Sequence, residues 1–217
     1  TPYERDLELG TGGARESFET PEYFEGWGLD RIGAAARYAE GAFGAGALVS
    51  VFDTGIDPDH PELAGAYLAE QSHSYFAGEM TDLEGHGSHV AGIVAAARDG
   101  VVMHGVAPET KILAFRSIEG PESERAGLFF ENWEDAMLRS VEAGADVMNN
   151  SWTFVRQDES LVRITDLTSR EDAVAYFGTN LIGTMAYAVQ QDLVSVYAAG
   201  NESGGEPSNT AGLPVHI

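Results

Sequence analysis

The chain has 217 residues, 43% of them hydrophobic, which is enough to bury one sizeable core. Its 35 acidic and 12 basic residues give a formal net charge of −23, so its field repels phosphate and disfavours nucleic acid as a partner. The sequence has no cysteine, which excludes disulfides, thiol catalysis and thiolate metal sites. No apolar run reaches the roughly 18 residues that a membrane-spanning helix needs, so we expect no membrane segment in this chain.

The first part of the chain differs in pattern from the rest. Residues 1–28 are rich in Glu, Gly, Thr and aromatic residues without a sustained period, which predicts an extended arm. Residues 29–217 are expected to form the globular unit. That unit opens with a helical stretch at 34–40, a glycine-rich turn, and an apolar run at 47–52 that is typical of a buried strand.

The following segments alternate between helical and strand patterns. Val90, Ile93, Val94 and Ala97 recur at helical spacing after Gly85, which predicts a helix with these residues on its inner face. Further helices are predicted around 133–144 and 174–190, and further strands at 111–116, 146–152 and 193–199. Strands separated by helices need crossover connections, so the pattern predicts an α/β three-layer sandwich with a mainly parallel sheet covered by helices.

Three polar residues fall at the carboxyl ends of predicted strands. These residues are Asp53, Ser151 and Asn201. Ligands of open parallel sheets bind at that edge, so we expect the three residues to converge on one cleft.

Asp53 and His86 have the residue types of an acid–base pair. Asp53 ends an apolar strand and is followed by Thr54, which fits either an ordinary turn or a buried carboxylate supplied with hydrogen-bond donors. His86 opens a helix between two glycines, so a substrate backbone has room to approach it. A histidine placed in this way acts as a general base when a carboxylate orients its other ring nitrogen. Asn201 fits either a turn or a donor to an oxyanion.

The other histidines are interpreted as structural. His89, one helical turn after His86, is expected to be buried and hydrogen-bonded, and His60 to stabilise a turn. A different interpretation makes His86 and His89 the metal ligands of a hydrolase. Their spacing lacks the nearby glutamate base of an HExxH motif, which disfavours that interpretation.

Four motifs together resemble the subtilisin-like serine proteases. DTGID at 53–57, HGSHVAG at 86–92, NNSW at 149–152 and AAGN at 198–201 occur in that family's order, over about 27–201. The resemblance implies that Asp53 orients the imidazole, that His86 is the general base and then acid, and that Asn201 donates to the oxyanion.

The family's nucleophilic serine has no counterpart before residue 217. It belongs to a GTSMA-like segment, and the similar GTMA at 183–186 lacks serine, precedes Asn201 and is predicted to lie inside a helix. We therefore expect the nucleophile beyond residue 217 and expect this chain alone to be inactive.

The resemblance also implies a groove for an extended peptide. Ser151, Trp152 and Thr153 correspond to the substrate-binding strand, and Ala199 with Gly200 to the opposite wall of the specificity pocket. The family commonly has glycine where this chain has Thr153, so side-chain specificity does not transfer.

Two further expectations come from the resemblance. Glu62 and Asp99 match positions that bind calcium in the family, and hard oxygen ligands suit that ion; the chemistry itself requires no cofactor. Residues 18–46 and 206–214 resemble the passenger domains of Gram-negative autotransporter proteases. That likeness implies a secreted or cell-surface protein displayed outside the outer membrane.

Two function classes follow from these observations. The first is a serine endopeptidase acting on polypeptides, with the remainder of the same protease as its partner if the chain is nicked near Ile217. The alternative is a catalytically silent peptide-binding module that retains the substrate groove. Turnover by the full-length protein distinguishes them.

Overall fold

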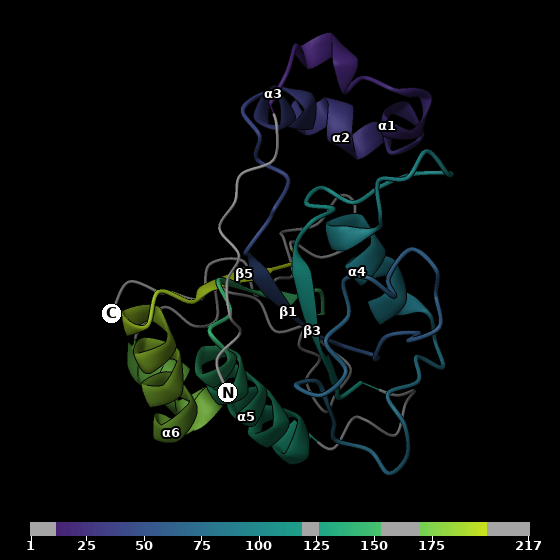
Figure 1. The fold of residues 1–217 in the computed structure, drawn as a ribbon. Helices are drawn as coiled ribbons and strands as arrows, with labels where there is room; N and C mark the ends of the chain where they lie inside the picture. The colour runs from purple at the N-terminus through teal and green to yellow at the C-terminus, as the bar shows by residue number, and fades with distance from the viewer. Residues whose placement is uncertain (1–11, 119–125, 153–169, 199–217) are drawn as a thin grey trace, which may run out of the picture.

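A five-stranded parallel sheet forms the centre of the molecule (Figure 1). The computed structural model describes residues 12–118, 126–152 and 170–198. The strand order is β2-β3-β1-β4-β5. The strands are β1 Leu48–Asp53, β2 His73–Ser74, β3 Lys111–Arg116, β4 Val147–Asn150 and β5 Val194–Tyr197.

The central strand β1 pairs with β3 on one side and with β4 on the other. All six of its residues are buried, as the apolar run predicts. The predictions for β1, β3, β4 and β5 are confirmed, with β4 and β5 shorter than expected. The two-residue edge strand β2 has no sequence signal of its own, because only its pairing with β3 defines it.

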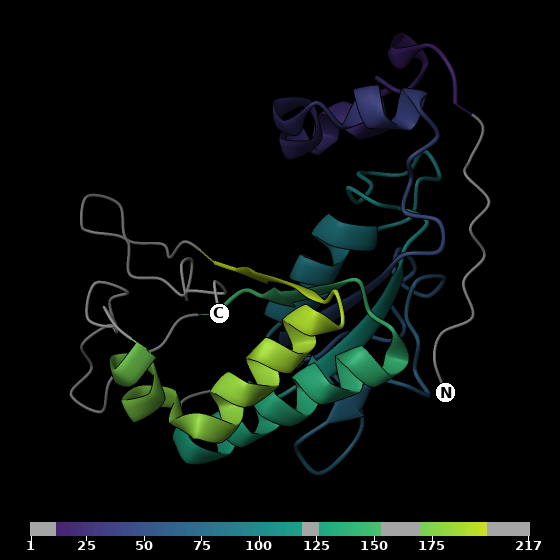
Figure 2. The same cartoon turned by 90° about the vertical axis from the view of Figure 1, so that its left-hand side faces the viewer.

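Helices cover both faces of the sheet, which confirms the predicted three-layer sandwich (Figures 1 and 2). Helix α4, His86–Ala95, packs on one face, where β1, β3 and α4 share an aliphatic core. Helices α5, Ala126–Ala143, and α6, Arg170–Gln190, lie side by side on the other face over an aromatic core centred on Trp133. None of the described helices combines the length and apolarity needed to cross a bilayer.

The inner face of α4 agrees with the predicted one only in part. Val90 and Val94 are partly buried and pack against the core as expected. The fully buried residues of the helix are Gly87, Ala91 and Ala95, and Ile93 is 48% exposed. Small residues four apart let the helix approach the sheet closely, and the larger Ile93 is displaced to the outer surface. The position of α4 against β1 therefore depends on small side chains.

Helix α6 contains the GTMA segment, as expected. Met185 is buried against the core, and the Thr184 hydroxyl donates to the Glu134 carboxylate at 2.9 Å. The helix is interrupted at Gly178, whose φ of 80° and ψ of 162° are non-helical. The GTMA segment therefore contributes to the packing of α6 against the core and α5.

The prediction of an extended arm over 1–28 is wrong for its described part. From residue 12 on, the chain forms the short helices η1 Arg15–Ser17, α1 Pro21–Glu25 and α2 Trp27–Ile32. Helix α3, Ala34–Ala39, follows them and confirms the predicted helical stretch at 34–40. Thr20 caps α1 by accepting from the Tyr23 amide at 3.2 Å, with Pro21 as its first residue. The aromatic residues that obscure the period pack into a separate small core around Tyr23 and Tyr38.

Candidate active site

Asp53, the last residue of β1, lies fully buried at the carboxyl edge of the sheet. Its Oδ1 accepts a hydrogen bond from the Thr54 amide at 2.8 Å. Its Oδ2 has no hydrogen-bond partner among the described residues. Burial raises the pKa of Asp53, although hydrogen bonds from His86 and Thr54 oppose that shift.

His86, the first residue of α4, is the partner of this carboxylate. Its Nδ1 lies 2.6 Å from the Asp53 Oδ1, and its side chain is 53% exposed. A carboxylate at this distance favours the tautomer with the proton on Nδ1, which leaves Nε2 as the basic nitrogen. The structure thus joins a buried carboxylate to an accessible imidazole.

Glycines bring the start of α4 against the end of β1. Gly85 adopts a left-handed φ of 82° immediately before the helix, a conformation that favours glycine. Gly87 lies against the backbone of Gly55, and its amide donates to the Thr54 hydroxyl at 2.8 Å. The glycines that flank His86 in the sequence therefore determine where its ring lies.

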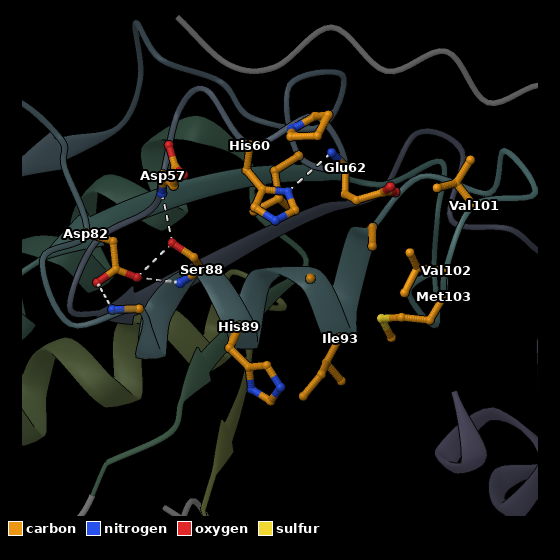
Figure 3. A pocket seen from close by; sticks show the side chains of 15 residues that line it. Asp57, His60, Glu62, Asp82, Ser88, His89, Ile93, Val101, Val102 and Met103 are labelled. Carbon is orange, nitrogen blue, oxygen red and sulfur yellow. Dashed lines mark hydrogen bonds between the residues drawn. The ribbon is translucent and has the colours of Figure 1, made fainter. Parts of the chain in front are cut away.

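Sequence reasoning missed Asp82, which organises the start of α4. Its Oδ1 accepts from the Thr54 hydroxyl at 2.9 Å and from the amides of Glu84 and Gly85 at 3.1 and 2.8 Å. Its Oδ2 accepts from the amide and the hydroxyl of Ser88 at 2.8 and 2.7 Å (Figure 3). Burial alone would raise the pKa of Asp82, but these hydrogen bonds hold it below its usual value. The only available signal is an aspartate three residues before a helix-opening glycine.

The proposed substrate-binding residues are only partly described. Ser151 follows β4, and its hydroxyl accepts from the Asn149 side-chain amide at 2.8 Å. The Trp152 side chain is buried in the aromatic core against Trp133, so only its backbone is a candidate for peptide contact. Residues Thr153, Ala199, Gly200 and Asn201 lie outside the described residues.

The prediction that His89 is buried is wrong. Its side chain is exposed on the outer face of α4 and lines a surface pocket of about 710 Å³ (Figure 3). His89 follows His86 by three residues, so both occupy the solvent side of the helix. His60 lines the same pocket and accepts from the Glu62 amide at 3.3 Å, which confirms its role in a turn.

Glu62 and Asp99 lie close enough to influence each other. Burial raises the pKa of Glu62, and the charge of Asp99 raises it further. The Glu62 Oε2 is buried without a hydrogen-bond partner in the described part of the chain, whereas the Asp99 amide donates to the Glu22 carboxylate at 3.1 Å. The orphaned oxygen fits a cation, but the described residues include no group of three or more acids or histidines placed to hold a metal ion.

The structure therefore shows a carboxylate–imidazole pair of the acid–base type at the carboxyl edge of a parallel sheet. Comparison with protein families gives a match between residues 44–217 and the family model described as Subtilase family. The chain therefore belongs to the subtilase family.

Individual relatives agree with that assignment. An extracellular serine protease of Serratia marcescens is 34% identical over 181 residues, covering 80% of this chain and 16% of that protein. Fervidolysin of Fervidobacterium pennivorans is 36% identical over 133 residues, covering 58% of this chain and 19% of that protein. The crystal structure of MycP1 without its N-terminal propeptide superimposes with a TM-score of 0.61 at 26% identity. That match covers 84% of this chain and 50% of MycP1, so the chain spans half or less of these three relatives.

Proposed function

We propose that this chain is the N-terminal part of the peptidase domain of a serine endopeptidase. The observation that carries the proposal is the 2.6 Å contact between the Asp53 carboxylate and the His86 imidazole in a member of the subtilase family. In this function Asp53 fixes the imidazole and stabilises its protonated form. His86 takes the proton from the attacking serine and then delivers it to the leaving amine.

The remaining catalytic groups belong to this proposal on the strength of the family motifs. Asn201 donates its side-chain amide to the oxyanion of the tetrahedral intermediate. The nucleophilic serine lies beyond residue 217. The GTMA segment does not supply it, because that segment has no serine and its Thr184 hydroxyl is bonded to Glu134 within the α5–α6 layer.

The substrate in this proposal is an extended polypeptide. Backbone groups of residues 151–153, at the end of β4, pair with it on one side, and residues 199–200 form the opposite wall. Ser151 directly follows β4, at the same edge of the sheet as Asp53, which supports a shared groove. The large acidic excess of the chain favours cationic peptides over acidic ones.

We propose that the protein acts outside the cell. The Serratia marcescens relative is named as extracellular, and residues 18–46 and 206–214 resemble autotransporter passengers, which favours display at the outer membrane. Protease accessibility of the native protein on intact cells tests this. Protection in intact cells and cleavage only after lysis would contradict it.

Calcium binding remains a proposal centred on Glu62 and Asp99. The orphaned Glu62 oxygen beside a second acid is the feature that supports it. If calcium binds there, adding the ion to the native state raises the unfolding temperature, and Glu62→Gln reduces that increase. Equal increases in the wild type and the variant would assign any calcium effect to another place.

A fluorophosphonate probe on the full-length protein tests the endopeptidase proposal. The expected result is labelling of a serine beyond residue 217, abolished by His86→Ala. His89→Ala is the matched control, because His89 is an exposed histidine on the same helix and should leave labelling unchanged.

Two results would overturn the proposal. Peptide binding without labelling or turnover would favour the silent binding module. Stoichiometric zinc with chelator-sensitive hydrolysis would favour the metal hydrolase.

A further inference from the structure

We propose that Asp82 is a positioning residue that holds the first turn of α4 against the end of β1 and thereby fixes His86 relative to Asp53. Asp82 contacts neither side chain of the pair, so it acts through the backbone that carries them. Its activity tests rest on the proposed function, and its structural test does not.

Two side chains hold the backbone amides around His86. The Gly85 and Ser88 amides donate to Asp82, and the Gly87 amide donates to Thr54. The first amides of a helix have no partner within the helix, so these bonds determine the position of the first turn of α4. The amides of the three neighbours Gly85, Gly87 and Ser88 are thus held by two side chains, Asp82 and Thr54, that lie outside the helix.

Thr54 connects this arrangement to the acid of the pair. Its hydroxyl donates to the Asp82 Oδ1 at 2.9 Å while accepting from the Gly87 amide at 2.8 Å. Its own amide donates to Asp53 at 2.8 Å. Thr54 therefore links the Asp53 carboxylate to the Asp82 carboxylate through hydrogen bonds.

Ser88 provides a second connection to the segment after β1. Its hydroxyl donates to the Asp82 Oδ2 at 2.7 Å and accepts from the Asp57 amide at 2.8 Å (Figure 3). Asp82 is therefore joined at both of its oxygens to residues 54–57 and to α4. A shift of α4 along β1 would break both connections.

The ionised form of Asp82 is the one that this arrangement requires. Five donors converge on its two oxygens, and a carboxylate accepts on both. An asparagine has the same shape, but its amide group would face at least one backbone donor. Asp82→Asn is consequently a small change in shape that should displace the first turn of α4.

The activity test compares inactivation of the full-length protein by a fluorophosphonate probe in the wild type and Asp82→Asn. We expect the maximal inactivation rate to fall about 10- to 100-fold with the probe's half-saturation concentration nearly unchanged, because misplacement of a reacting group affects the chemical step. Thr54→Val should act in the same way, and Thr54→Ser should restore the wild-type rate.

Asp135→Asn is the matched control. Asp135 is a partly exposed aspartate on α5 that accepts from Tyr75 and Arg139, and its pKa is also lowered. This variant should unfold at a lower temperature while keeping the maximal inactivation rate. If Asp82→Asn behaves like this control, Asp82 is merely structural and the inference is wrong.

A structural readout separates this inference from the proposed function. The His86 Nδ1 proton, bonded to Asp53, should give a strongly downfield NMR signal that Asp82→Asn shifts or broadens. If the wild type is not labelled by the probe but the signal responds, the proposed function fails and the positioning role stands. If the wild type is labelled and neither rate nor signal responds, the positioning role fails alone.

Discussion

A Cβ atom on residue 87 would lie 2.2 Å from the carbonyl oxygen of Gly55. No rotamer change relieves this contact, because the backbone determines the position of a Cβ atom and the oxygen itself belongs to the backbone. Gly87→Ala should therefore push the start of α4 away from β1 and reduce probe labelling of the full-length protein by about 100-fold or more. Labelling kinetics measure the effect.

Gly183→Ala is the matched control for that substitution. Gly183 lies inside α6, and among the described residues no group outside its own turn of helix comes within 4 Å of the place that an added methyl group would take. Alanine favours the helix over glycine by about 1 kcal/mol, so this variant should be as stable as the wild type or more so, with unchanged labelling. Equal labelling of both variants would contradict the close-approach argument.

Asp53→Asn should stabilise the fold at neutral pH while abolishing labelling. The pKa of Asp53 is raised by burial above its ordinary 3.8, so the folded state binds the proton more tightly and loses stability as pH rises through this range. Asparagine carries no charge and avoids that loss. We expect the variant to have the larger free energy of unfolding at pH 7 and the gain to shrink toward pH 3.8, as measured by urea unfolding. A variant less stable than the wild type at pH 7 would contradict this sign.

The sequence predicted the elements that bear the acid–base pair because their patterns are local. The apolar run ending at Asp53 fits a buried strand, and the glycines around His86 fit a close approach, and the structure brings both residues together. His89 was misplaced because helical spacing does not tell which face of α4 meets the sheet. Asp82 was missed because its donors come from separate segments, and only the folded chain shows their convergence.

The N-terminal helices show a second limit of sequence patterns. Helices of five or six residues are too short to display a hydrophobic period, so α1 and α2, within residues 21–32, were not predicted as helices. Their stability comes from the aromatic core around Tyr23 and Tyr38, which is a tertiary property.

The Trp133 indole and the Asn150 amide form a buried pair behind β4. The Trp133 Nε1 donates to the Asn150 Oδ1 at 2.9 Å, and both side chains are fully buried. Trp133→Phe removes the indole N–H and leaves the buried Asn150 Oδ1 without this donor. We expect the free energy of unfolding to fall by about 2 kcal/mol. Trp27→Phe, at a side chain 78% exposed, should change it by less than about 0.5 kcal/mol. Similar losses for both would show that the hydrogen bond is unimportant.

The Tyr75–Asp135–Arg139 cluster should make stability depend on acid pH. Asp135 accepts from the Tyr75 hydroxyl at 2.8 Å and from the Arg139 Nε at 2.5 Å, and these bonds lower its pKa against the effect of burial. The stabilisation is present above pH 3.8 and lost as pH falls through the lowered pKa. Asp135→Asn should cost about 0.5–1 kcal/mol at pH 7, discounted because the pair is partly exposed.

The measurement is urea unfolding of both proteins at pH 7 and pH 3. The difference in the free energy of unfolding between wild type and Asp135→Asn should be smaller at pH 3 than at pH 7, because the aspartate begins to be protonated below its ordinary pKa of 3.8. A difference that persists unchanged there would show that the aspartate acts through packing rather than through charge.

The acid–base pair is assembled from β1 and α4, which precede β3, α5 and α6 along the chain. A ribosome therefore synthesises both residues before these later elements. The buried position of Asp53 nevertheless depends on strands made later, because β1 lies between β3 and β4 in the sheet.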